Sequence, residues 1–180
     1  INSVGEVAEH CYTVEVDSLG FPPPLPDSSL CGGRRDVGGD DRIDIYVLEL
    51  GGSYFGETVP EAPCGTIPWQ TPGFMKIDND YIGYGYDDNP IEALRVTVAH
   101  EFFHLIQFGF DSNEDIWWME ATAVFMEDEV YNDVNDYVNY LPDFLEHPEV
   151  PLDDPSLGSN HVYGAVLFPK YLKETEGSHI

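Results

Sequence analysis

The sequence predicts an α+β domain. Strand-like patterns lie in the first half of the chain, and helix-like patterns lie in the second half. Residues 42–50 alternate polar and apolar side chains, which is typical of a half-buried strand. From Pro90 onward the chain is rich in the Ala, Leu, Phe and Glu that long helices prefer. We therefore expect a single domain over residues 1–180, with a sheet-and-loop part at 1–89 and a helical part at 90–180.

The first half alternates short regular segments with Gly- and Pro-rich ones. Residues 3–16 are predicted to start as a helix. Proline and glycine dominate residues 20–41 and 51–73, so both stretches are predicted loops on either side of the strand just described. A short second strand follows at residues 73–78 (GFMKID), and Pro72 before it predicts an edge position in the sheet.

The second half begins with the most strongly predicted helix. Asn89 suits its N-cap, Pro90 its first position and Gly109 its end. Further helices are predicted at residues 114–131, at 133–148 with an interruption at Pro142, and at 161–174 with a kink or break at Pro169; residues 148–160 are a predicted loop.

The charge excludes one class of partner. Asp and Glu number 34 against 7 Lys and Arg, a formal net charge of -27, so phosphates would be repelled and nucleic acid is excluded as a partner. Bound calcium or a salty medium would offset the self-repulsion; acidity that only keeps a secreted protein soluble is the simpler alternative. No apolar run is long enough to span a membrane. The chain ends carry no boundary signal, and we expect a mature or trimmed piece of a longer chain.

The three cysteines, Cys11, Cys31 and Cys64, lie outside any CxxC arrangement, which argues against a cysteine metal site. One disulfide in an extracellular setting, with one thiol left over, is the preferred interpretation, and three thiols are the alternative. Cys31 with Cys64 is the pair we would choose, because both lie in Gly/Pro-rich loops.

The predicted helix from Pro90 contains an HExxH motif. In VTVAHEFFHLIQ, His100 and His104 are four residues apart and therefore share one helix face. Glu101 lies beside them, where it can reach a water on a metal that both histidines bind. A core or surface helix that happens to contain these residues is the alternative, and a third ligand decides between the two. Glu120, in the apolar setting WWMEATAVF, is that candidate, because a buried carboxylate without a partner is costly.

HEFFHLIQ followed by WWMEATAVFMED resembles the gluzincin group of zinc metallopeptidases, which includes thermolysin-like proteases and the aminopeptidase N type. It is closer still to secreted bacterial proteins of this type with a HEFFH…WWMEGTA pattern. The resemblance covers residues 90–131 well and implies a zincin-like fold, with a small twisted N-terminal sheet over the active-site helix and a helical C-terminal part. It implies zinc on His100, His104 and Glu120, with Glu101 as general base.

Two features depart from the family pattern. Fifteen residues separate His104 from Glu120, which is a short connection for this group, and Ala121 stands where Gly is common. Glu127 is a fallback third ligand, although its acidic neighbours indicate a solvated position.

Three supporting roles can be assigned around such a centre. Tyr163 and His161 are candidate oxyanion donors, because related enzymes use a downstream Tyr or His; packing roles are the alternative. Asp128 or Glu127, or a backbone carbonyl, could accept the other ring N–H of a ligand histidine. The strand at 73–78 could pair with an extended peptide substrate, or serve only as a structural edge.

Two acidic clusters could bind calcium through carboxylate oxygens, or be solvated loops. The first comprises Asp36, Asp40, Asp41 and Asp44, and the second comprises Asp78, Asp80, Asp87 and Asp88.

We therefore expect a secreted or extracellular zinc-dependent peptidase, with an endopeptidase preferred, that acts on a peptide or protein substrate. The alternatives are a non-catalytic, acidic, calcium-binding structural or adhesive module with a degenerate zincin fold, and a peptidase that acts only on its own precursor or on a partner subunit.

Overall fold

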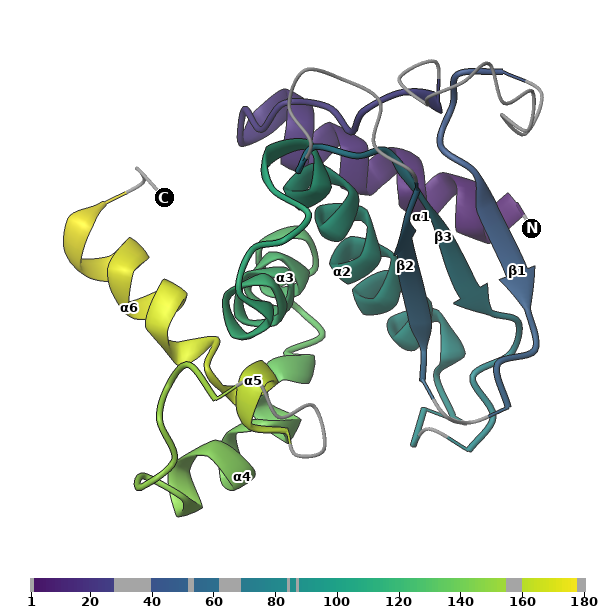
Figure 1. Cartoon of the computed structure of the whole chain (residues 1–180). Coiled ribbons are helices and arrows are strands. Elements are labelled where there is room, and N and C mark those ends of the chain that lie inside the picture. The colour runs from purple at the N-terminus through teal and green to yellow at the C-terminus, as the bar shows by residue number, and fades with distance from the viewer. Residues whose placement is uncertain are drawn as a thin grey trace. The chain divides into compact units, whose positions relative to one another are not determined.

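A computed structural model describes residues 2–27, 40–51, 54–61, 69–83, 85–86, 88–154 and 160–177. The chain forms two compact units, Ile1–Asn113 and Glu114–Ile180. Among the described residues, the first unit contains both strands and helices and the second contains only helices, so the fold is α+β (Figure 1). The helix that carries the HExxH motif belongs to the unit that contains the sheet.

Two helices form the helical layer of the first unit. Helix α1 spans Asn2–Tyr12 and continues as a short π-helix, η1, over Thr13–Ser18. Helix α2 spans Pro90–Phe110, as predicted, with Pro90 in its first turn. Gly109 does not end it: the helix continues to Phe110 and is capped by Asp111 in extended conformation.

Within the residues that the structure describes, the sheet of the first unit has three strands in the order β1-β3-β2. Strand β1 (Ile45–Leu48) runs parallel to β3 (Gly73–Asp78), and β2 (Gly56–Pro60) runs antiparallel to β3. The edge position predicted for GFMKID is therefore wrong, because β3 is the central strand and is hydrogen-bonded on both sides. Pro72 lies just outside the strand, where its missing N–H removes no bond from the ladder.

Strand β2 lies in a stretch that was predicted to be a loop, and that prediction is wrong at these five residues. Its ends are Gly56 and Pro60, which are usually signs of a loop. The glycine is required here, because a Cβ at Gly56 would lie 2.7 Å from Thr97 Cγ2 and 2.9 Å from Glu101 Cγ. Strand β2 thus runs closer to α2 than a larger residue would permit.

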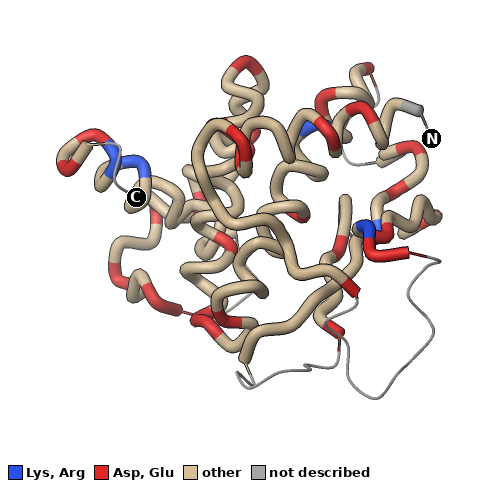
Figure 2. The backbone as a smooth tube through the Cα atoms, turned by 90° about the horizontal axis from the view of Figure 1, so that it is seen from above, with Lys and Arg blue, Asp and Glu red and all other residues tan. Residues whose placement is uncertain are grey.

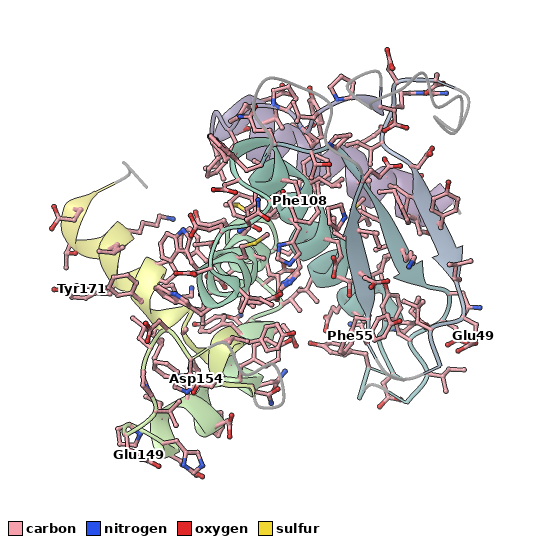
Figure 3. The ribbon with its side chains drawn as sticks, viewed as in Figure 1. Glu49, Phe55, Phe108, Glu149, Asp154 and Tyr171 are labelled. Carbon is pink, nitrogen blue, oxygen red and sulfur yellow. The ribbon has the colours of Figure 1, made fainter. Side chains whose placement is uncertain are left out.

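The core of the first unit lies between the sheet and α2, which also packs against α1 (Figure 1). Met75 and Ile77 on β3 are fully buried, and only 2% of the surface of Phe102 on α2 is exposed. Phe108, near the end of α2 (Figure 3), accepts the N–H of Thr71 through its carbonyl at 3.0 Å. This bond ties the residues before β3 to the helix, and apolar burial on both sides holds α2 in place.

The described part of the second unit contains five helical segments. They are α3 (Ile116–Val130), the 3₁₀ segment η4 (Asp136–Asn139), α4 (Leu141–Glu146), α5 (His161–Gly164) and α6 (Leu167–Glu176). Pro142 lies in the first turn of α4 instead of interrupting a helix, and Pro169 lies in the first turn of α6. This follows from proline's missing N–H, which the first turn of a helix does not use.

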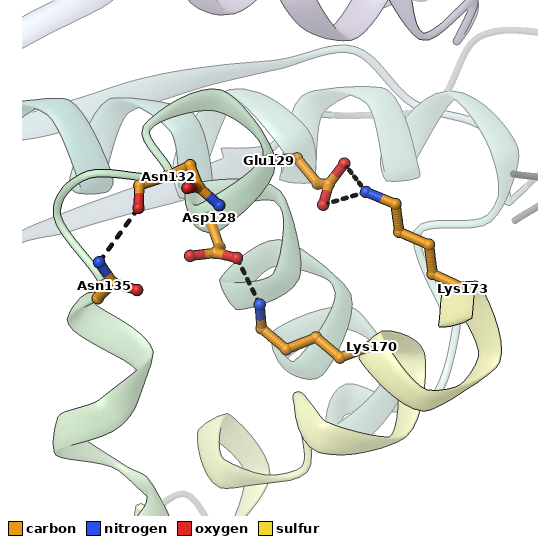
Figure 4. A network of polar contacts seen from close by, with 6 residues as sticks. All are labelled: Asp128, Glu129, Asn132, Asn135, Lys170 and Lys173. Carbon is orange, nitrogen blue, oxygen red and sulfur yellow. Dashed lines mark hydrogen bonds and ion pairs between the residues drawn. The ribbon is translucent and has the colours of Figure 1, made fainter. Parts of the chain in front are cut away.

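Two ion pairs join α3 to α6 (Figure 4). Lys170 Nζ donates to the buried carboxylate of Asp128, and Lys173 Nζ donates to Glu129 Oε1 at 2.6 Å. Lys170 also lies 4.2 Å from the centre of the Tyr137 ring. The lysine offsets the cost of burying the carboxylate, and the aromatic ring stabilises the lysine, so these contacts hold α6 on α3.

Acidic residues are spread along the described chain, whereas Lys and Arg occur at only a few places (Figure 2). Within the described part, none of the helices has the length and apolar character to cross a bilayer.

Candidate metal centre

The two histidines of HExxH converge on α2. Their Nε2 atoms lie 3.0 Å apart and their rings meet edge to face, with centroids 4.7 Å apart. The helix produces this arrangement, because residues four apart lie above one another on one face. Two imidazole nitrogens on a tetrahedral zinc, each at about 2.0–2.1 Å, would lie about 3.3 Å apart. The histidine pair is therefore already close to the geometry that one shared metal ion requires.

Gln107 determines which nitrogen of His104 can bind a metal. Its Oε1 lies 2.6 Å from His104 Nδ1, one turn further along α2. An amide oxygen only accepts hydrogen bonds, so Nδ1 must carry the proton and Nε2 presents its lone pair toward His100. A ligand histidine needs such an acceptor behind it.

Glu101 is held by the sheet. Its carboxylate is buried, with 7% of the residue exposed, and Thr58 Oγ1 on β2 donates to its Oε2 at 2.6 Å. The same hydroxyl lies 2.9 Å from the backbone carbonyl of Glu101. The hydroxyl has one hydrogen, and both the shorter distance and the negative charge assign it to the carboxylate. Strand β2 thus orients the side chain that lies next to His100 in sequence.

Glu120 lies on the second turn of α3 and is half-buried. Among the described residues, His100, His104 and Glu120 form a group in which one ligand atom from each lies within 4.8 Å of the others. Two imidazoles and one carboxylate are a donor set that catalytic zinc sites use, and it leaves a fourth position for water.

Glu15, on η1, is a feature that the sequence analysis did not single out. It is 0% exposed, and neither of its carboxylate oxygens has a hydrogen-bond partner in the described structure. Burial raises the pKa of Glu15 well above its usual value, and the charge of His100 acts in the opposite direction.

The two candidate oxyanion donors lie on α5 in the second unit. His161 is buried, its Nε2 lies 3.0 Å from the carbonyl oxygen of Pro151, and its ring packs on Phe144 with centroids 4.8 Å apart. A carbonyl only accepts, so Nε2 donates to the backbone, which favours a structural role for this histidine. Tyr163 is half-buried and its ring packs on Tyr140 at 5.2 Å.

The residues after Glu120 differ from expectation. Glu127 was expected to be solvated, and this is wrong: it is 5% exposed, because α3 is buried on most sides. Asp128, considered as an acceptor behind a ligand histidine, is paired with Lys170 in its own unit (Figure 4).

One residue in each acidic cluster has several hydrogen-bond donors beside it. Asp40 accepts from Arg42 Nε at 2.9 Å and from its Nη2 at 2.6 Å, and these hydrogen bonds lower the pKa of Asp40. Asp78 accepts backbone N–H groups of Leu50, Asp80 and Tyr81. Asp36 and Asp87 lie outside the described residues, as do Cys31 and Cys64, the disulfide pair we would choose. Cys11 is buried in the first unit.

Sequence reasoning missed three residues beside the histidine motif. A helical-spacing argument could have found Gln107, because it lies three residues after His104. No sequence signal marks Thr58, which contacts Glu101 from a strand distant in sequence, or Glu15, which is buried in the π-helical segment η1.

Comparisons of the chain with protein-family models, with curated proteins and with solved structures found no match.

Proposed function

We propose that the chain is a zinc-dependent peptidase with a zincin-like fold, in which His100, His104 and Glu120 hold the metal and Glu101 is the general base. One observation carries the proposal: the two Nε2 atoms meet at 3.0 Å while Gln107 holds the proton of His104 on Nδ1. Nitrogen lone pairs repel each other unless a proton or a cation lies between them, and zinc is the cation that this donor set suits best.

The length of the connection supports Glu120 as the third ligand. Helix α2 ends at Phe110 and α3 begins at Ile116, which leaves five residues between them. Glu120 is four residues into α3 and His104 is six residues before the end of α2. A connection of this length is within the range that joins consecutive helices, which is compatible with a third ligand from α3.

Bound zinc would supply a Lewis acid that polarises the scissile carbonyl and lowers the pKa of its water to about 7. Glu101 accepts the proton of the attacking water and later delivers it to the leaving amine. Because Thr58 donates to Oε2, we assign Oε1 to this proton transfer. Tyr163 remains the candidate donor to the oxyanion, and His161 is the less suitable one because of its bond to Pro151.

The substrate strand is reassigned from β3 to β2. Strand β2 is an edge of the described sheet, and its Thr58 contacts Glu101. An extended peptide that adds to this edge would bring its backbone alongside the base. The acidic composition and the cysteines suit a secreted protein. Counting the free thiols of the native chain tests this, because one disulfide leaves one thiol and no disulfide leaves three.

The test is elemental analysis of the purified chain, followed by cleavage of casein and of a quenched peptide with and without a chelator. We expect about one zinc per chain and cleavage that the chelator abolishes. Glu101→Gln should retain zinc and lose cleavage, whereas Glu92→Gln on the same helix should retain both. Bound calcium alone, with no cleavage by the parent chain, would instead support the structural module. If generic substrates fail but zinc is bound, the precursor or partner subunit becomes the substrate to test.

A further inference from the structure

Glu15 occupies an unusual position for a carboxylate. It is fully buried, and within the described structure neither oxygen has a hydrogen-bond partner. Burying a carboxyl group without a hydrogen bond costs free energy, so such a residue needs an explanation. It also lies in the π-helical segment η1, and π-helical turns occur frequently at functional sites.

Residues before and after η1 pack on α2. Tyr12, three residues before it, packs edge to face on Phe102 with ring centroids 6.1 Å apart. Phe21, six residues after it, packs on Phe103 at 5.1 Å. Phe102 and Phe103 lie between the two histidines in sequence, so the residues that flank Glu15 contact the stretch of α2 that carries the motif. Burial raises the pKa of Glu15, and a positive charge on His100 would lower it, which is consistent with His100 lying near this carboxyl group.

A ligand histidine that binds metal through Nε2 must place its Nδ1 hydrogen on an acceptor. Gln107 takes this position behind His104, at 2.6 Å. We propose that Glu15 is the positioning residue for His100 and receives its Nδ1 hydrogen when a metal binds on Nε2. This inference rests on the proposed function, because it needs His100 to be a ligand. It adds a residue from the N-terminal helix, 85 positions away in sequence, to the centre built on α2.

The role predicts effects of opposite sign with and without metal. In the metal-free protein the buried carboxyl lacks a hydrogen bond, so an apolar side chain of similar volume should fit as well or better. In the metal-bound protein the same change removes the acceptor behind His100, and affinity should fall. A residue that only fills space would not lower metal affinity while leaving the metal-free fold intact.

The experiment uses the full 180-residue chain with Glu15→Leu and Glu15→Gln. Zinc affinity is measured by competition with a chromophoric chelator, and metal-free stability by urea unfolding with a chelator present. We expect Glu15→Leu to weaken zinc binding about 10- to 100-fold while metal-free stability is retained or rises. Glu15→Gln should weaken it less, because the amide oxygen still accepts. Asp17→Asn is the matched control: it removes one charge from an exposed position two residues away and should retain parent affinity.

Three results distinguish a failure of the role of Glu15 from a failure of the proposed zinc-dependent function. Zinc bound by the parent, with equal affinity in Glu15→Leu, overturns the role of Glu15 and leaves the proposed function standing. A parent chain that binds no zinc overturns both. If Glu15→Leu does not fold, Glu15→Gln decides: a severalfold weaker affinity supports the role and parent affinity overturns it.

Discussion

Removing the hydroxyl of Thr58 should slow cleavage more than it weakens substrate binding. Thr58→Val keeps the shape of the side chain but deletes the 2.6 Å bond to Glu101 Oε2. A hydrogen bond to a charged group contributes about 1.5–3 kcal/mol. At 1.36 kcal/mol for each factor of ten, kcat/KM should fall about 10- to 150-fold. Because Thr58 orients the base, we expect the loss to appear mainly in kcat.

The assay is steady-state cleavage of a quenched peptide by zinc-loaded protein, with zinc content measured on each variant. Thr58→Ser keeps the hydroxyl and should recover most of the parent kcat. Thr175→Val, which removes an exposed threonine hydroxyl on α6, should have no effect. A Thr58→Val variant with parent kcat and full zinc would refute the reasoning that β2 positions the base.

Three further predictions concern the same unit. Gly56→Ala should lower the free energy of unfolding by about 1–3 kcal/mol, because the new Cβ would meet side-chain atoms of α2 at 2.7 and 2.9 Å; Gly5→Ala, which meets nothing within 4 Å, should not destabilise in the same urea titration. Burial raises the pKa of Asp78. The three backbone N–H groups that donate to its carboxylate together lower the pKa by a larger amount, so the net shift is downward. Its stabilisation is therefore present above the unfolded-state value of about 3.9 and lost as pH falls through the lower folded-state pKa. Asp78→Asn should cost about 1–3 kcal/mol at pH 7, and the gap to the parent in unfolding experiments should close below about pH 3.9; a gap independent of pH would contradict the assignment. Gln107→Leu should weaken zinc binding at least about tenfold in chelator competition, since His104 loses the acceptor that fixes its tautomer; unchanged affinity would count against that role.

The sequence by itself determined the helix that carries the motif. The spacing of His100, Glu101 and His104 along one helix fixes their relative positions, because helix geometry depends only on neighbours within four residues. Pro90 and the apolar run that follows predict the helix start correctly, and the structure extends it by a single residue beyond Gly109. The α+β class followed from the same local patterns.

Only the tertiary structure decided what surrounds the motif. Gly56, Thr58 and Pro60 indicate a loop when considered locally, yet pairing with β3 makes them an edge strand against α2. The central position of β3 likewise depends on strands that pair with it on both sides. Strand β1 precedes the predicted loop at residues 51–73, and β2 lies within it. Glu15 has no local signal at all, yet the folded chain buries it completely. Strand pairing and burial sum contacts between segments far apart in sequence, so no local pattern specifies them, whereas a helix closes its own hydrogen bonds within one turn.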